Sequence, residues 1–319
     1  MTRTYPTQLA FPFSHSRGPG ARPFLKWAGG KGQLLDQIGR LLPAELREGR
    51  ITKYAEPFIG GGAVFFSIAN RFGMRECFLS DMNEDLILAY RTIQQQVEAL
   101  IHRLDEIQRH YYGLTPGGRK QFYYEIRETF NQGRGASAGN VWRRDPALHV
   151  ARLIFLNRTC FNGLYRVNSR GDFNVPFGNY RKPRICDAPN LRSVSQSFQN
   201  AEIHFADFTA CKGFVDERTF VYLDPPYRPI SRTSSFNSYY KNPFNDAEQR
   251  RLAGFYHELG SAGARLMLSN SDPHNENPQD MFFEELYSGF SIHRVVASRR
   301  INSNAAKRGP ITELLITNY

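Results

Sequence analysis

An apolar run closed by two prolines most constrains the fold of this 319-residue chain. Residues 219–223 (Thr-Phe-Val-Tyr-Leu) have the pattern of a short buried strand. Pro225 and Pro226 cannot continue a hydrogen-bonded ladder, so the strand must end before them. Asp224 and Tyr227 are therefore expected at the carboxyl end of a strand, where open α/β sheets place their chemistry. Taken alone, the tetrapeptide fits a simple strand-ending turn equally well.

A glycine turn after an earlier predicted strand indicates a nucleoside-type cofactor. Residues 56–62 (Glu-Pro-Phe-Ile-Gly-Gly-Gly) follow the strand at 51–55, and three successive glycines let a ligand approach the backbone closely. Asp81 ends the next predicted strand, where a carboxylate suits a ribose diol. The turn departs from GxGxxG, which disfavours a dinucleotide. The carboxylates of Glu56, Asp81 and Asp224 suit the cationic sulfonium of S-adenosylmethionine, although a lone glycine turn is often structural.

The order of predicted elements is that of a doubly wound, mostly parallel α/β sheet. Strand, glycine turn, helix, strand and acidic residue succeed one another, and further strands are expected at 202–205, 220–223, 264–268, 292–297 and 311–317. A mainly helical stretch interrupts this pattern. We therefore expect a flexible N-terminal arm over 1–22, a catalytic domain formed by 23–98 and 200–319, and a target-recognition insertion over 99–199.

The insertion is predicted to carry a β-hairpin among its helices. Residues 168–172 (Asn-Ser-Arg-Gly-Asp) are a strong turn signal between two short apolar segments, 164–167 and 173–175. Polar helices are expected around 101–108 and 121–130, with a glycine-rich loop at 113–118 between them. A loop rich in Ser, Thr and Tyr at 231–242 is expected beside the tetrapeptide.

The charge of the chain indicates a polyanionic partner. Its formal net charge is +11, with a pI near 9.6. Residues 101–200 carry 16 Lys and Arg against 7 Asp and Glu, so the surplus is concentrated in the insertion. Residues 291–310 contain no acid and five basic residues. Solvated basic faces are common, so charge alone favours a nucleic acid without proving it.

Composition also bears on compartment and metals. Four cysteines, Cys77, Cys160, Cys186 and Cys211, show no CxxC spacing, so neither a zinc site nor a disulfide framework is indicated and no metal is expected. No apolar run approaches the roughly 20 residues that cross a bilayer. A reducing cytoplasm is the expected compartment.

The tetrapeptide has the chemistry to act on a base amine. The N6 amine of adenine is a poor nucleophile because its lone pair is delocalised into the ring. The Asp224 carboxylate and the Pro225 carbonyl can accept its two N–H bonds, which favours a tetrahedral nitrogen whose lone pair faces a methyl donor. Tyr227 offers an aromatic face to a base taken out of the stack. This chemistry requires neither a covalent nucleophile nor a metal.

Five motifs stand in order along the chain: Lys26-Trp27-Ala28-Gly29-Gly30-Lys31, Glu56–Gly62, Asn162-Gly163-Leu164-Tyr165-Arg166, Phe173–Gly178 and Asp224-Pro225-Pro226-Tyr227. From Phe24 to its end, the sequence resembles the Dam-type, D12 class DNA adenine methyltransferases, and is most similar to those that methylate GATC. The resemblance implies a Rossmann-like methyltransferase sheet, S-adenosylmethionine as cofactor and double-stranded DNA as substrate.

The resemblance also implies roles for individual residues. Asp224, Pro225, Pro226 and Tyr227 match the catalytic motif. The cofactor is expected on Trp27, Lys31, Glu56, Phe58, Gly60, Asp81 and Asp224. DNA contacts are expected from Lys26, Arg158, Phe161, Asn162, Leu164, Arg166, Asn168 and Pro176.

Within the DNA-binding set, Lys26 and Arg166 are expected to contact guanines, Arg166 through a bidentate pair with O6 and N7. Leu164 and Pro176 are expected near the thymine methyl, and Arg158 and Asn168 on phosphates. Phe161 stands where the family often has Tyr, which keeps stacking and loses a hydroxyl contact.

Other interpretations stay open at this stage. Trp27 also suits a core position, Lys31 a solvated helix, Arg166 a plain surface, and Leu164 and Pro176 hairpin packing. Other functions are methylation of another DNA site, of RNA or of a protein amide, and silent repression by a DNA-binding protein. Asp at position 224 and the basic insertion favour duplex DNA adenine, and the intact tetrapeptide disfavours a repressor. A cognate restriction endonuclease is a candidate partner. A monomer is expected, with a dimer as the alternative.

Overall fold

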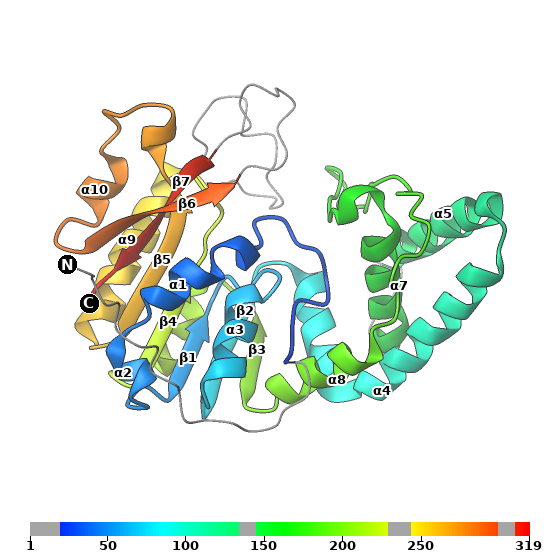
Figure 1. Cartoon of the computed structure of the whole chain (residues 1–319), viewed down its shortest axis with the longest axis horizontal. Helices are drawn as coiled ribbons and strands as arrows, with labels where there is room; N and C mark the ends of the chain where they lie inside the picture. The colour runs from blue at the N-terminus through cyan, green and yellow to red at the C-terminus, as the bar shows by residue number, and fades with distance from the viewer. Residues whose placement is uncertain (1–19, 134–144, 229–243, 299–309) are drawn as a thin grey trace, which may run out of the picture.

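The fold is built on one mixed sheet, seen in a computed structural model that describes residues 20–133, 145–228, 244–298 and 310–319 (Figure 1). Within these ranges seven strands pair in the order β3-β2-β1-β4-β5-β7-β6. Neighbours from β3 to β5 are parallel, and β7 is antiparallel to both β5 and β6. The strands are β1 (Lys53–Glu56), β2 (Glu76–Asp81), β3 (Ala201–Phe205), β4 (Thr219–Leu223), β5 (Arg265–Ser271), β6 (Ser291–Ser298) and β7 (Pro310–Thr317). The predicted mostly parallel sheet is confirmed.

The central strands are apolar because both of their faces are covered. Every residue of β1 and β4 is buried, as in a parallel sheet with helices on both sides. Tyr54 and Tyr222 face one apolar cluster, and Ala55 and Val221 face the other. Helices α1 (Leu35–Arg40), α2 (Ala44–Arg47) and α3 (Ala63–Arg71) cover the first face, and α9 (Asp246–Ser261) and α10 (Phe282–Leu286) the second (Figure 1).

Helices occupy the chain between β2 and β3 and extend to one side of the sheet (Figure 1). They include α4 (Glu84–Gly113), α5 (Pro116–Gln132), α7 (Pro146–Thr159) and α8 (Ala188–Ser197). The loop predicted at 113–118 is shorter than expected, because only residues 114 and 115 lie between α4, which ends at Gly113, and α5, which begins at Pro116. Thr115 caps this helix by accepting a hydrogen bond from Gly118 N, and proline suits the first helical position. The predicted domain boundaries stay predictions.

The predicted hairpin has no regular strands. Two isolated antiparallel bridges, Cys160 with Phe177 and Val167 with Phe173, hold its arms together. The first arm starts with a sharp bend, since Asn162 and Gly163 have φ values of 57° and 64°. Left-handed residues interrupt a hydrogen-bonded ladder, so no strand can form through Asn162 and Gly163, directly before the predicted arm at 164–167.

Two predicted mobile segments fall mostly outside the described residues. The loop at 231–242 lies outside them, as do residues 1–19 of the predicted arm. Ala21, at the end of that arm, is buried, and its N–H donates to Asn70 Oδ1 at 3.1 Å. Among the described helices, none combines the length and the apolar character that a membrane span requires.

Candidate active site and nucleic-acid interface

Asp224 lies at the carboxyl end of β4 and is held by two side chains. Its Oδ1 accepts a hydrogen bond from Ser269 Oγ of β5 at 2.8 Å and pairs with Lys31 Nζ at 2.8 Å. The side chain of Lys31 is 6% exposed and that of Asp224 is 19% exposed. Lys31 Nζ also donates to Gly29 O at 2.8 Å. Because Lys31 and Ser269 both hold Oδ1, this largely buried ion pair fixes the position of the carboxylate.

The hydroxyl end of Tyr227 is held by a residue from another strand, β7. Its hydroxyl donates to Glu313 Oε2 of β7 at 2.6 Å, and Lys31 Nζ lies 4.6 Å from its ring centroid. Burial, aided by the Asp224 and Glu313 carboxylates, raises the pKa of Tyr227 well above its usual range, so the hydroxyl stays a donor. Glu313 was not predicted. Its signal in the sequence is a single acid within the apolar run at 311–317.

The glycine turn after β1 receives Trp27 and Asp81. Gly60 and Gly62 have φ values of 47° and 72°, which favour glycine. A Cβ atom on Gly61 would lie 3.0 Å from Trp27 Cβ, so the indole packs directly on the turn. Gly60 N donates to Asp81 Oδ2 at 3.0 Å. The structure thus brings together the turn, Trp27 and the acid at the end of β2, as the sequence predicted.

Glu56 and Phe58 occupy different environments at this turn. Glu56 is buried, and Tyr54 donates its hydroxyl to Glu56 Oε2 at 2.7 Å. Burial raises the pKa of Glu56 well above its usual range, which weakens its predicted role as an anion beside the cofactor. Phe58 is half-buried, with its ring centroid 5.4 Å from that of Phe208.

A pocket of about 330 Å³ adjoins Tyr227, a volume typical of small-ligand sites. Its lining includes Gly30, Lys31, Tyr227, Asn275, Thr312 and Glu313. A larger hollow of about 740 Å³ lies at the amino ends of β2 and β3, near Arg75 and Asn200, and contains none of the predicted site residues.

The predicted DNA-contacting residues fall into two groups. Phe161, Asn162, Arg166 and Pro176 are exposed, Phe161 by 53%. Leu164 is half-buried beside them. Arg166 Nε donates to Asn174 Oδ1 at 2.8 Å, and the residue stays exposed. This exposed group, together with Lys26 described below, has the accessibility that contacts with DNA require.

Arg158 and Asn168 form the second group and are engaged in the fold. Arg158 is half-buried and donates to Phe24 O at 2.8 Å, and burial lowers its pKa. Asn168 Oδ1 accepts from the backbone N–H groups of Arg170 and Asp172 at 3.0 and 2.9 Å. These contacts give both side chains a structural task, and their predicted contacts with phosphate stay predictions.

Asn157 joins the first glycine loop to the hairpin, a link that the sequence did not reveal. This buried amide accepts from Lys26 N at 2.8 Å, donates to Lys26 O at 2.9 Å and donates to Gly163 O at 3.2 Å. A Cβ atom on Gly163 would lie 2.2 Å from Lys26 Cδ, so the exposed lysine crosses the hairpin backbone. Lys26 therefore lies where the first glycine loop meets the hairpin, and its predicted contact with guanine stays a prediction.

Tyr165 makes a second link between these regions. Its ring stacks on Trp27 with centroids 4.8 Å apart and planes at 27°. Its hydroxyl donates to Asp85 Oδ2 at 2.6 Å, and Asp85 Oδ1 lies 3.3 Å from His149 Nε2. Tyr165, Asp85 and His149 are all buried, so the hairpin rests on a polar network in the helical region.

The family and the relatives of the chain agree with this geometry. The model of the D12 class N6 adenine-specific DNA methyltransferases matches residues 27–301. The type II methyltransferase M.MjaIII of Methanocaldococcus jannaschii is 48% identical over 93% of this chain and 99% of its own. The type II methyltransferase M1.LlaDCHI of Lactococcus lactis is 38% identical, over 93% and 95%. The DNA adenine methylase of Escherichia coli is 33% identical, over 92% and 94%. The chain therefore belongs to the D12 class of N6 adenine-specific DNA methyltransferases, as the resemblance in its motifs implied.

Proposed function

We propose that this enzyme transfers a methyl group from S-adenosylmethionine to N6 of an adenine in double-stranded DNA, within the site GATC and with the target base turned out of the helix. The observation that carries the proposal is the cluster of Asp224, Lys31 and Tyr227 at the carboxyl edge of the sheet. The loop that carries Lys31 also contacts the two neighbouring regions: Trp27 packs on the glycine turn, and Lys26 packs on the hairpin.

The residues at the glycine turn fit the cofactor that the family implies. Gly60 and Gly61 carry no Cβ atoms, which lets the Trp27 side chain pack directly on the turn, and Gly60 N donates to the Asp81 carboxylate. Trp27, Lys31, Phe58, Gly60, Asp81 and Asp224 would hold S-adenosylmethionine, with Glu56 supporting the turn from within. When bound, the cofactor supplies an electrophilic methyl group.

The remaining chemistry belongs to the tetrapeptide. Lys31 and Ser269 both contact Oδ1 of Asp224, so we assign Oδ2 to accept a hydrogen bond from the adenine amine. The Pro225 carbonyl accepts the other, which keeps the nitrogen lone pair available. Tyr227 presents its ring to the base, and the pocket beside it gives room for a base outside the helix.

We infer GATC as the recognition sequence from Lys26 and the residues of the hairpin. Lys26, Phe161, Asn162, Leu164, Arg166 and Pro176 are the reading residues, and five of the six are exposed. A guanidinium with free N–H groups reads guanine, and an apolar contact reads the thymine methyl. The test is transfer of labelled methyl groups to duplexes that contain GATC or differ from it by one base pair. RNA and an amide peptide serve as further arms.

We expect transfer to adenine in GATC and at least about tenfold less in every single-pair variant. Equal transfer to a variant duplex would exclude GATC as the site, and labelling of RNA or peptide alone would overturn DNA as the substrate.

Asp224→Ala tests the role of the tetrapeptide. We expect methyl transfer to fall below about 1% of the parent, with the Kd for DNA within about threefold, because the carboxylate is assigned to the target amine and the cofactor and not to the rest of the DNA. Glu217→Ala, an exposed acid before the start of β4, is the control and should be fully active. Ordinary turnover by Asp224→Ala would refute this assignment.

We also propose that the enzyme acts as a monomer and protects DNA from a cognate restriction endonuclease. Two of its relatives are named type II methyltransferases, which supports a role in modification. A sedimentation measurement on DNA should give one protein chain per duplex. A stable dimer on the site would contradict the monomer.

A further inference from the structure

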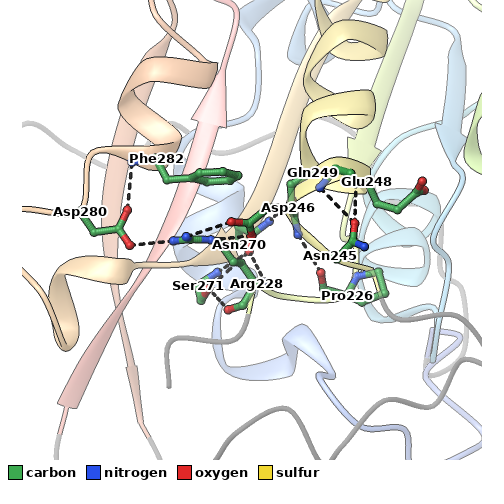
Figure 2. A network of polar contacts seen from close by, with 11 residues as sticks. Pro226, Arg228, Asn245, Asp246, Glu248, Gln249, Asn270, Ser271, Asp280 and Phe282 are labelled. Atoms are coloured by element: carbon green, nitrogen blue, oxygen red, sulfur yellow. Dashed lines mark hydrogen bonds and ion pairs between the residues drawn. The ribbon is translucent and has the colours of Figure 1, made fainter. Parts of the chain in front are cut away.

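Side chains of α9 and β5 bond to the backbone of Pro226 and of Arg228, the two chain neighbours of Tyr227 (Figure 2). Gln249 Nε2 donates to Pro226 O at 3.1 Å, ahead of the tyrosine. After it, Arg228 N donates to Asn270 Oδ1 at 3.2 Å. Asn270 Nδ2 in turn donates to Gln249 Oε1 at 3.1 Å, and both amides are fully buried. The two sides of the turn are therefore joined through one buried pair of side chains.

The Arg228 side chain adds contacts with the start of α9 and with one further segment, which contains Asp280. Its Nε and Nη2 atoms lie 2.9 and 3.2 Å from the two carboxylate oxygens of Asp246, the first residue of α9. Its Nη1 donates to Asp280 Oδ2 at 2.7 Å, and its guanidinium carbon lies 4.1 Å from the ring centroid of Phe282 (Figure 2). The Arg228 side chain is 21% exposed.

The chemistry of arginine explains why this residue stands directly after the tyrosine. Its planar fork binds one carboxylate through two bonds and keeps a further N–H for a second carboxylate. Lysine has the same charge and no fork, so it cannot hold both partners at fixed angles. The carbonyl of Arg228 also accepts from Ser271 Oγ at 2.8 Å. Main chain and side chain of one residue are thus both fixed.

We propose that Arg228 is a positioning residue for methyl transfer: it anchors the turn so that the Tyr227 ring and the Asp224 carboxylate face the target adenine together. The inference rests on the proposed function of these two residues. Glu313 holds the Tyr227 hydroxyl from β7, so the ring is fixed at its tip by one strand and at its backbone by Arg228. Misplacement of reacting groups by about 1 Å can cost about 100-fold in rate.

If Arg228 served only the stability of the fold, its removal would lower the Tm more than the rate of methyl transfer. Asp246 is 53% exposed and Asp280 is 26% exposed, so solvent weakens what these ion pairs add to stability. Removing Arg228 should therefore act on the chemical step much more than on folding.

The experiment compares Arg228→Gln and Arg228→Lys in the full-length enzyme. Single-turnover rates are measured with saturating S-adenosylmethionine and a GATC duplex, with KM for each and the Tm. We expect Arg228→Gln to lower the rate about 10- to 100-fold with both KM values within about threefold. Arg228→Lys should recover only part of that loss. Arg192→Gln removes another bidentate arginine, paired with Glu98 on the helices, and should leave the rate unchanged.

Several outcomes would overturn the inference. A parental rate for Arg228→Gln, a full recovery by Arg228→Lys, or a loss found only in KM would each exclude positioning by the fork. If Arg228→Gln does not fold, Asp280→Ala removes one of the two carboxylates that Arg228 binds and should lower the rate about fivefold, and an unchanged rate would contradict the inference. An active Asp224→Ala enzyme would refute the proposed function itself. An inactive one beside a fully active Arg228→Gln would refute only this inference.

Discussion

Asp224 at the sheet edge and Arg166 on the hairpin are held in different ways. The Asp224 carboxylate is fixed by two side chains, Lys31 and Ser269, each from a different segment. Arg166 is exposed, and the hairpin that carries it is supported from beneath by the hydroxyl of Tyr165 on Asp85. At the sheet edge the functional groups hold one another, whereas on the hairpin the support lies under the backbone.

The difference fits the roles proposed for the two regions. Chemistry on an amine needs an acceptor at a fixed place, and a preorganised group loses no free energy in reaching it. Readout of a base edge needs donors that remain available to DNA, because a guanidinium already saturated by protein cannot bind guanine. The rigidity of the hairpin must then come from buried groups that never touch the substrate. Four changes test this comparison.

The largest effect on folding should come from Asp85→Ala. It leaves the Tyr165 hydroxyl and His149 buried without their shared carboxylate, which should cost about 3–5 kcal/mol of the free energy of unfolding. Urea unfolding measures it. Glu84→Ala, exposed in the same first turn of α4, is the control for the helix dipole and should cost below about 1 kcal/mol. Similar costs for the two variants would show that the hairpin does not depend on its buried network.

Lys31→Ala should act mainly on the reaction. It removes the cation that holds Asp224 and faces the Tyr227 ring, so we expect kcat to fall about 100-fold, about 2.7 kcal/mol in activation free energy. The Kd for DNA should change less than about threefold. Lys212→Ala removes an exposed lysine paired with Glu258 and serves as the control. If Lys31→Ala keeps the kcat of the parent enzyme, the Asp224 carboxylate does not need Lys31 to hold it in place.

Arg166→Ala should change specificity and not catalysis. We expect a loss of about 1–3 kcal/mol in discrimination at one base pair, measured as the ratio of kcat/KM between GATC and single-pair variants. Arg170→Ala, 84% exposed on the same turn, should change affinity for all duplexes alike. Unchanged discrimination in Arg166→Ala would mean that its exposure does not serve base readout.

The smallest effect concerns an ion pair at the rim of the sheet. Arg251 holds both oxygens of Asp207 at 3.0 and 2.7 Å and, as the main cause, lowers the pKa of that carboxyl to about 2 from 3.8. A lowered pKa means that the pair stabilises the fold above about pH 4, and that this contribution is lost as the pH falls toward 2. Because both side chains are about two-fifths exposed, the contribution should stay below about 1 kcal/mol.

Asp207→Asn should therefore be slightly less stable than the parent near neutral pH, and this difference should shrink as the pH falls through about 2, when unfolding by urea is compared near pH 7 and near pH 2. If the two proteins differ in free energy of unfolding by the same amount at both pH values, the difference does not come from ionisation of Asp207.

The sequence predicted the structure correctly where the conformation of a short segment depends only on its own residues. The prolines after 219–223 end β4 because no later residue can restore their missing N–H groups. The glycines after β1 form a turn because their positive φ values exclude other residues. The predicted hairpin has isolated bridges in place of regular strands, and Asn162 and Gly163 bend the chain directly before its first arm. Gly117 and Gly118 suggested a loop, but the cap at Thr115 starts a helix there.

The sequence by itself determined the sheet, the glycine turn, the tetrapeptide and the family, because each depends on residue types in a fixed local order. Only the tertiary structure decided which side chains hold that site. Glu313 reaches Tyr227 across 86 positions, Asp280 reaches Arg228 across 52, and Tyr165 reaches Asp85 across 80. Such partners leave no periodic signal, since a hydrogen bond between distant segments depends on how whole elements pack.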